Sequence, residues 1–209
     1  MHPRLGPLLP HPARDPRAAP PVAEAGPRLI CVEGSVTLVS PGRSHESKGH
    51  RLDRLIGMVC LELGIPCQAL GSTTWALPPG SGDTAYEADE AYLIGHTGDD
   101  QAEATPDLAV EVVVTHPASK ALRAGELLKI PELWVLDLNH NSLTFHRLAT
   151  RGKAAGRYRE VSKSRAFPFL SSAEVLERLN DPEADDTAFL RACRDWVRRV
   201  LVPRQQRGG

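Results

Sequence analysis

The 209-residue sequence has no long apolar run and no closely spaced cysteines. No stretch of about 18 consecutive apolar residues occurs, so no membrane-spanning helix is indicated. The cysteines form neither a CxxC pair nor a zinc-finger spacing with histidines, which disfavours a structural zinc site. Isolated cysteines are typical of buried, reduced side chains, so we expect a cytoplasmic protein. They are Cys31, Cys60, Cys67 and Cys193.

Several short catalytic motifs are missing as well. The sequence contains no P-loop, no GxGxxG turn, no serine nucleophile elbow and no HExxH helix. Their absence disfavours the corresponding nucleotide-binding and hydrolase classes, and we expect no organic cofactor.

There is almost no net charge, −1, which argues against non-specific binding of polyanions by the chain as a whole. The charges are unevenly distributed, however. Nine acids and no Lys or Arg lie between Asp83 and Glu111. The C-terminal segment instead carries arginines, namely Arg191, Arg194, Arg198, Arg199, Arg204 and Arg207. A solvated acidic loop is the simpler explanation of the acidic stretch, and a functional group of acids is the alternative.

The chain is long enough for one domain with a substantial core and short for two. Residues 1–28 are rich in proline and arginine and lack the apolar segment of a secretory signal. We expect these residues to be a disordered leader, or upstream sequence included by a misplaced start codon.

Apolar periodicity predicts an α/β (α+β) protein with a central mixed sheet flanked by helices. A hairpin is expected over 29–39 with Gly34 in its turn. The other expected strands are 66–70, 73–77, 86–94, 108–115, 132–138 and, at an edge of the sheet, 142–148. The expected helices are 44–63, 117–129, 171–179 and 187–201. Because the helix over 117–129 joins two strands, those strands should be parallel neighbours in a right-handed βαβ unit.

Glu111 is an acid within a nearly continuous β-branched strand, where an unpaired carboxylate is strongly unfavourable. Asp107, four positions earlier on the same face, would lie roughly 13 Å away, too far to share one ion. Asp89, at the start of a neighbouring strand, is the natural second acid. Two carboxylates from adjacent strands and a main-chain carbonyl form a hard oxygen site suited to Mg²⁺ or Mn²⁺. A strand acid paired with a lysine explains the pattern equally well.

Three blocks follow one another in the sequence, and together they carry a family resemblance. They are Glu87–Ile94 (EADEAYLI), Pro106–Val114 (PDLAVEVVV) and Ile130–Asp137 (IPELWVLD). With the Val32-Glu33-Gly34 hairpin and His45, they resemble the Uma-two family of proposed restriction endonucleases. This is a domain-of-unknown-function group within the PD-(D/E)XK nuclease superfamily. The resemblance implies a restriction-endonuclease-like core over 29–170, which leaves 171–209 as a C-terminal helical extension with a basic tail.

The resemblance also implies roles for individual residues. Asp89 and Glu111 match the metal-binding acids, and the main-chain carbonyl of Val112 would complete the site. The superfamily's lysine two residues after the glutamate is absent, because Val113 stands there. Relatives supply a lysine from the next helix, and Lys120 is the nearest candidate, one position out of register.

Supporting roles fall to Asp107, Glu87 and His45, the last as a proton shuttle or simply as a helix-cap histidine. The helix after the glutamate strand usually ends Tyr-x-x-x-Gly-Val-Pro-Glu in the family. Here Gly125 and Lys129 stand where the aromatic residue and the glycine belong. We expect the missing tyrosine to remove a packing anchor or a polar contact near the site.

The leading hypothesis is a Mg²⁺- or Mn²⁺-dependent endonuclease that hydrolyses DNA phosphodiester bonds, with Asp89, Glu111 and Lys120 as its catalytic residues. The C-terminal arginines are candidate phosphate contacts. A homodimer is expected only by analogy with nucleases that cut both strands. The alternative is a catalytically inactive nuclease-fold protein that binds DNA or another partner, or a relic of a mobile element.

Overall fold

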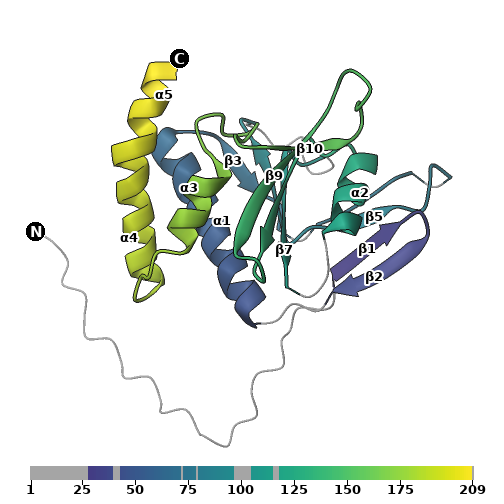
Figure 1. Cartoon of the computed structure of the whole chain (residues 1–209), viewed down its shortest axis with the longest axis horizontal. Coiled ribbons are helices and arrows are strands. Elements are labelled where there is room, and N and C mark those ends of the chain that lie inside the picture. The colour runs from purple at the N-terminus through teal and green to yellow at the C-terminus, as the bar shows by residue number, and fades with distance from the viewer. Residues whose placement is uncertain are drawn as a thin grey trace, which may run out of the picture.

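Two β-sheets and the surrounding helices form the part of the chain that the computed structural model describes, residues 28–39, 43–71, 73–78, 80–96, 105–114 and 118–208 (Figure 1). The strands are β1 (Arg28–Val32), β2 (Ser35–Val39), β3 (Cys67–Ala69), β4 (Thr74–Ala76), β5 (Ala85–Glu87), β6 (Glu90–Ile94), β7 (Leu108–Val113), β8 (Glu132–Asp137), β9 (Ser142–Leu148) and β10 (Tyr158–Val161). The helices are α1 (Arg43–Leu63), α2 (Ser119–Leu127), α3 (Ser172–Leu179), α4 (Asp186–Trp196), the π-helical segment η1 (Val197–Leu201) and α5 (Val202–Gly208). The expected mixed α/β class is confirmed. The predicted leader lies outside the described residues except for Arg28, which begins β1.

The larger sheet has the strand order β10-β9-β8-β7-β6-β3. Its β7 and β8 are parallel and are joined by α2, as predicted, whereas the other neighbours are antiparallel. The register aligns Leu108 with Glu132 and Glu111 with Val135. All six residues of β7 are buried, which explains its unbroken apolar sequence around Glu111.

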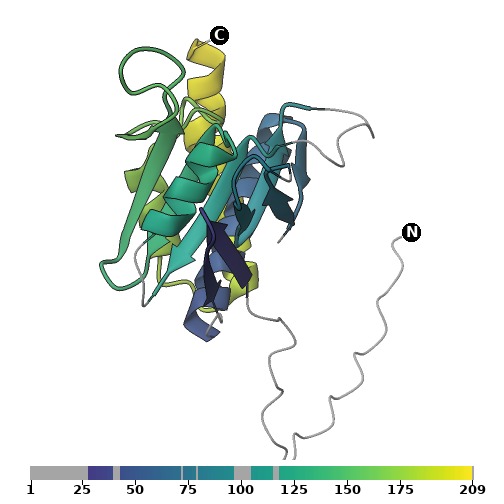
Figure 2. The same ribbon diagram turned by 90° about the vertical axis from the view of Figure 1, so that its right-hand side faces the viewer.

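The smaller sheet has the order β2-β1-β5-β4, with every pair antiparallel. Its β1–β2 hairpin is as predicted. Glu33 and Gly34 form the turn with φ angles of 50° and 82°, the two positive values that a type I′ turn requires. The hairpin and α2 lie together over one face of the larger sheet (Figure 2).

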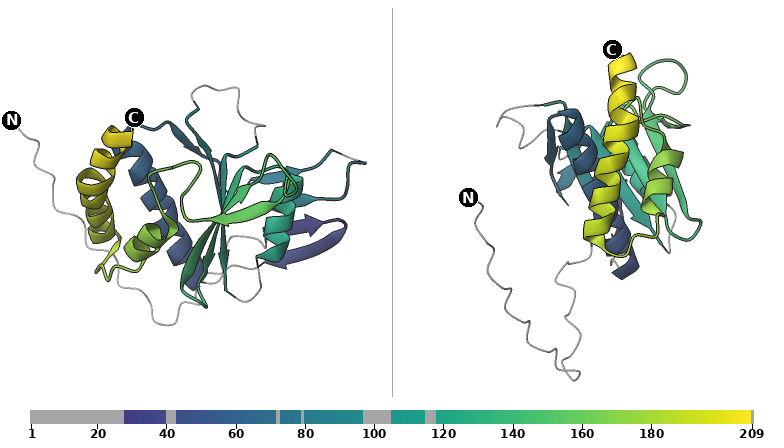
Figure 3. Two further views of the ribbon diagram at one scale, coloured as in Figure 1. Left: turned by 45° about the horizontal axis from the view of Figure 1, so that its top comes forward. Right: turned by 90° about the vertical axis from the view of Figure 1, so that its left-hand side faces the viewer.

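The two faces of the larger sheet pack against different elements (Figure 3). One face packs against α1 and α3, with α4 and η1 in an outer layer against α1, and the other face packs against α2 and the smaller sheet. Alternation along β7 places Val110 and Val112 in the first core and Ala109 and Val113 in the second. Glu111 therefore points to the side of α2 and the smaller sheet.

Three predicted elements differ from the structure. The strand expected over 86–94 is two strands, β5 and β6, which belong to different sheets and are separated by Ala88 and Asp89. No glycine or proline marks this crossing in the sequence. The segment 142–148 forms β9 but is not an edge, because β10 pairs with it; β10 is too short to give a periodic signal. The helix expected over 187–201 changes to π-helical geometry after Trp196.

The C-terminal helices belong to the same hydrophobic core as α1 and β7. Val175 and Leu179 of α3 and Phe189 and Cys193 of α4 are all buried in it. The predicted boundary at 170/171 therefore separates segments that share one core. Among the helices in the described ranges, none is both long enough and apolar enough to cross a membrane.

Candidate active site

Asp89 lies at the point where the chain leaves the smaller sheet and enters the larger one. Its N–H donates to the Val110 carbonyl at 3.1 Å. Its carboxylate in turn accepts a 2.6 Å hydrogen bond from the Val112 N–H. These two bonds hold Asp89 beside β7. Asp89 is only 6% exposed. Val112 therefore lies next to Asp89, and it contacts the carboxylate through its N–H, whereas the resemblance assigns its carbonyl to the metal.

Two basic side chains meet the Asp89 carboxylate. Arg28, from the first residue of β1, forms an ion pair with Oδ1. His45, from the start of α1, places Nε2 3.1 Å from Oδ2 and is itself buried. Asp89 is thus a buried carboxylate whose charge is compensated by an arginine, because an unpaired buried charge would be strongly destabilising.

Glu111 is buried a short way along β7, and its carboxylate accepts a 2.8 Å hydrogen bond from the Tyr86 hydroxyl. Burial raises the pKa of Glu111 to about 7, although the Tyr86 hydrogen bond and the positive charge of Arg28 both act to lower it. Burial, with the nearby Glu111 charge, also raises the pKa of Tyr86 well above its ordinary value. We call Arg28, His45, Tyr86, Asp89 and Glu111 the acid cluster.

Lys120 is near the start of α2, and its ammonium is bound to the hairpin. It donates to the Ser35 hydroxyl at 3.0 Å and to the Thr37 hydroxyl at 2.6 Å. These two hydrogen bonds connect α2 to β2. In the described part of the chain the Lys120 ammonium contacts these hydroxyls and not Asp89 or Glu111. Its predicted catalytic role therefore requires that it release them.

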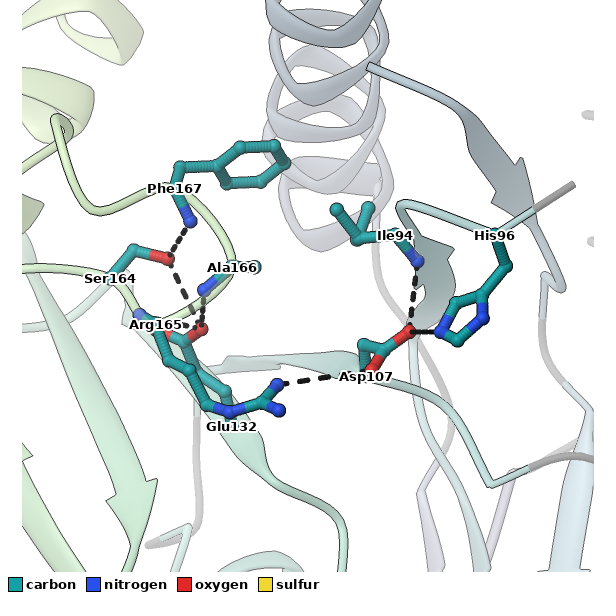
Figure 4. A network of polar contacts seen from close by, with 8 residues as sticks. All are labelled: Ile94, His96, Asp107, Glu132, Ser164, Arg165, Ala166 and Phe167. Atoms are coloured by element: carbon teal, nitrogen blue, oxygen red, sulfur yellow. Dashed lines mark hydrogen bonds and ion pairs between the residues drawn. The ribbon is translucent and has the colours of Figure 1, made fainter. Parts of the chain in front are cut away.

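The acids expected to support the site lie in different places. Glu87 ends β5 and accepts the N–H of Leu29 at 3.4 Å, so it helps to position β1, whose first residue is Arg28. Asp107 precedes β7, at the opposite end of the strand from Glu111. It accepts the Ile94 N–H at 3.0 Å, lies 2.9 Å from His96 Nε2 and lies 3.8 Å from Arg165 (Figure 4). Asp107 thus connects neighbouring segments at the N-terminal end of β7 and is not part of the acid cluster.

The acid cluster has the donor chemistry of a magnesium site, but it lacks open space. Mg²⁺ is commonly held by one or two carboxylates together with water and phosphate oxygens. Asp89 and Glu111 could supply the two carboxylates. Within the described ranges, no three His, Cys, Asp or Glu side chains come together as a metal site. The cavity beside Asp89 has a volume of about 10 Å³, at the lower limit for one water molecule. A divalent ion at Asp89 would therefore replace the guanidinium of Arg28.

Sequence reasoning missed two members of the acid cluster. Arg28 was assigned to the leader, and nothing local in the sequence links it to Asp89. Tyr86 was expected only as a strand residue. Its position three residues before Asp89 gives no hint of a bond to Glu111, because that bond arises where two sheets meet.

Comparison with known proteins identifies the family. A family model described as Uma2, "Putative restriction endonuclease", matches residues 17–184. The chain belongs to the Uma2 family. A similar solved structure is that of a putative nuclease belonging to DUF820 from Anabaena variabilis ATCC 29413. It is 14% identical with a TM-score of 0.50, and the match covers 76% of this chain and 94% of that chain. Among curated proteins none matches.

Membership of the Uma2 family supports a nuclease function, and the solved structure shows the same fold. The resemblance predicted from the three sequence blocks is thereby confirmed. The matched segment also begins before Leu29 and extends past residue 170, so it includes Arg28 and α3.

The departure from the Uma2 pattern at Gly125 is compensated within the fold. A Cβ atom at Gly125 would lie 2.5 Å from the Tyr158 hydroxyl, so the ring of Tyr158 occupies the space beside this helix position. The hydroxyl donates to the Ile130 carbonyl at 2.9 Å. The packing anchor that we expected to be missing is thus supplied by β10. Lys129, where the family has glycine, takes the positive φ of 60° that ends the helix.

Proposed function

We propose that this Uma2 protein hydrolyses DNA phosphodiester bonds as a Mg²⁺- or Mn²⁺-dependent endonuclease, with Asp89 and Glu111 at its reaction centre. The observation that carries the proposal is the acid cluster. One buried carboxylate, Asp89, immediately precedes β6 and the other, Glu111, lies in β7. Arg28 pairs with Asp89 and acts on Glu111 as well, but burial still raises the pKa of Glu111 to about 7.

This electrostatic balance favours an additional positive charge. The guanidinium of Arg28 compensates Asp89 directly, whereas among the described residues Glu111 receives a single hydrogen bond, from Tyr86. A divalent ion would favour the ionised form of Glu111 more strongly than a monovalent guanidinium does. When bound, such an ion would supply a nucleophilic water and offset charge on the phosphoryl group.

The protein's own residues would hold and orient the acids. The Val112 N–H and the Tyr86 hydroxyl fix the Asp89 and Glu111 carboxylates, respectively. Lys120 would provide positive charge near the phosphate after exchanging the Ser35 and Thr37 hydroxyls for it. His45, at 3.1 Å from Asp89, is placed to exchange a proton with that carboxylate.

A catalytically silent, DNA-binding Uma2 protein is the second candidate. Two observations favour it: Arg28 occupies the position next to Asp89 that a cation would take, and Lys120 is bound to the hairpin. In such a protein Arg28 would serve as a permanent counter-ion, and the acids would stabilise the junction between the two sheets.

Plasmid nicking distinguishes these candidates. We expect purified protein to nick supercoiled DNA with Mg²⁺ or Mn²⁺ and to leave it intact in EDTA. Glu111→Gln and Asp89→Asn should each reduce the rate at least 100-fold, whereas Glu177→Gln, at an exposed acid of α3, should not change it. Equal nicking by Glu111→Gln, or nicking in EDTA, would reject the assignment of the acid cluster. DNA binding without nicking by the wild-type protein would support the silent alternative.

Arg28→Met tests the requirement that the arginine be displaced. Removing the guanidinium should lower the Mn²⁺ concentration needed for half-maximal nicking, because the ion no longer competes with Arg28 for Asp89.

A homodimer, which would allow both strands to be cut, is part of the same proposal. Sedimentation equilibrium with and without duplex DNA measures it.

A further inference from the structure

A cationic groove lies at the edge of the larger sheet formed by β9 and β10. It consists of two adjoining hollows of about 500 Å³ and 330 Å³, which share the segment from Arg147 to Thr150. Their charged lining residues are all basic, namely Lys129, Arg147, Arg151, Arg159 and Arg165. We call these five residues the basic groove. A chain with a net charge of −1 thus carries one concentrated basic surface.

The centre of the groove is a pair of like charges. Arg147 of β9 and Arg159 of β10 are direct partners in the antiparallel register, so they project from the same face of the sheet. Like charges directly opposite each other destabilise a sheet. Within the described part of the chain, neither arginine forms an ion pair. The β8 neighbour of Arg147 is Glu132, and that carboxylate is buried and bound to the segment 164–166.

The remaining cations are held around this pair by the fold. Lys129 extends beneath the β9–β10 loop, where its ammonium would lie 3.4 Å from a Cβ atom at Gly156. Arg165 is anchored through its backbone N–H, which donates to Glu132, and its guanidinium lies 3.8 Å from Asp107 (Figure 4). The loop itself projects beyond the end of the sheet (Figure 1). Charges from three separate segments therefore meet on one surface.

The C-terminal arginines, which the sequence suggested as phosphate contacts, are arranged differently. Arg198 donates to both carboxylate oxygens of Glu62, at 2.6 and 3.1 Å, and Arg204 pairs with Glu174. These pairs neutralise part of the charge on that surface. In the basic groove Arg165 lies next to Asp107, but among the described residues none of the other four cations forms an ion pair, so the groove is the better candidate.

We propose that the basic groove binds the phosphate backbone of duplex DNA. Several uncompensated cations along an open surface match a polymer of phosphates better than they match one small anion, and arginine binds phosphate oxygens in bidentate fashion. No aromatic residue lines either hollow. Stacking of unpaired bases, the usual basis of single-strand binding, is therefore not provided, so the duplex is the expected form.

The groove is separate from the acid cluster. Arg147 aligns with Glu132, which aligns with Leu108 at the start of β7, whereas Glu111 lies three residues farther along that strand. Arg147 shares a face with Phe145, on the α1 side of the sheet, and Glu111 points to the α2 side. Binding in the groove therefore requires neither the metal nor the two acids. The choice of DNA rests on the proposed function, but the two proposals can fail separately because different residues carry them.

Charge reversal of one member of the arginine pair provides the test. Arg159→Glu would place a carboxylate opposite Arg147 and turn a repulsive pair into an attractive one. We expect the affinity for a fluorescein-labelled 20-base-pair duplex in EDTA and about 50 mM NaCl to fall at least 10-fold, and the Tm without DNA to rise. The comparison variant is Arg191→Glu, an equal charge change at an exposed position of α4. Arg191 belongs to the C-terminal arginines that the sequence suggested as phosphate contacts, and the proposal predicts that its reversal leaves the affinity within twofold. Fluorescence anisotropy and thermal unfolding measure the two effects.

The salt dependence of binding sharpens the result. Arg147→Ala combined with Arg159→Ala should reduce the slope of log K against log[NaCl] by about two, because two phosphate contacts are lost. Opposite changes in affinity and Tm for Arg159→Glu support the proposal, since a purely structural arginine would lose stability on reversal. Equal loss of affinity in Arg191→Glu would overturn it, and so would tighter binding of a single strand than of the duplex. If the wild-type protein failed to nick DNA while Glu111→Gln bound duplex DNA as tightly as wild type, only the proposed nuclease activity would be rejected.

Discussion

Two buried glutamates on neighbouring strands, Glu111 of β7 and Glu132 of β8, are held in very different ways. Glu132 is fully buried and accepts hydrogen bonds from the backbone N–H groups of Arg165 and Ala166 and from the Ser164 hydroxyl (Figure 4). The Trp134 indole also donates to it. Their distances are 2.8 to 3.1 Å. Glu111, in the part of the chain that the structure describes, accepts one hydrogen bond, from Tyr86, and burial raises its pKa to about 7.

The difference separates a structural carboxylate from one that is available for chemistry. Neutral donors surround the Glu132 oxygens, so this side chain holds the segment 164–167 against the sheet without a cation in contact. Glu111 has few donors, and an incoming proton or metal ion therefore lowers its free energy. Burial of an acid alone does not predict function; the number of donors around it decides.

The largest effect should follow from changing Glu132. Glu132→Gln places an amide NH₂ group where backbone N–H groups donate, which leaves buried donors without an acceptor. We expect a loss of about 3 kcal/mol in the free energy of unfolding. Urea denaturation at pH 7 measures it. Glu111→Gln is the matched control, because it is the same substitution but affects the hydrogen bond from the Tyr86 hydroxyl. Equal losses in the two variants would remove the distinction between the glutamates.

A smaller effect, opposite in sign, is expected for Glu111→Gln as pH rises. The folded-state pKa of Glu111 is raised from 4.5 to about 7, so the wild-type protein loses stability as pH increases between these values. The glutamine variant has no such loss. Its stability relative to wild type should therefore increase by about 2 kcal/mol between pH 5 and pH 8. His45, Tyr86 and Asp89 are common to both proteins, so their titration largely cancels in the difference. A pH-independent difference would show that Glu111 titrates normally.

The main elements of the fold follow from the sequence because they depend on local patterns. The I′ turn at Glu33-Gly34, the period of α1 and the β-branched run of β7 each fix a structure within a few residues. The paired acids could also be predicted from the sequence, because a carboxylate in an apolar strand requires a compensating positive charge. The same argument applied to Glu132 would have identified a second buried acid, but the sequence could not show that segment 164–166 satisfies it.

The remaining features depend on contacts between distant segments. Arg28 reaches Asp89 only because β1 pairs with β5, and Tyr158 fills the space at Gly125 only because β10 covers β9. Arg147 and Arg159 become partners through the same unpredicted strand. Each partner is set by strand register, for which one sequence offers no local signal.

The smallest effect, and the finest probe of the comparison, is Tyr86→Phe. This change deletes the single hydroxyl that donates to Glu111 and keeps most of the ring packing. Because that hydrogen bond lowers the pKa of Glu111, its loss should raise the pKa above about 7 and cost about 1 kcal/mol of stability at pH 8. At pH 5, where Glu111 is protonated in both proteins, the cost should shrink. Chemical denaturation at both pH values measures the change, and Ser164→Ala, which removes one hydroxyl donor from Glu132, provides the matched comparison. A pH-independent cost for Tyr86→Phe would mean that the hydroxyl serves packing alone, and that Glu111 is as firmly held as Glu132.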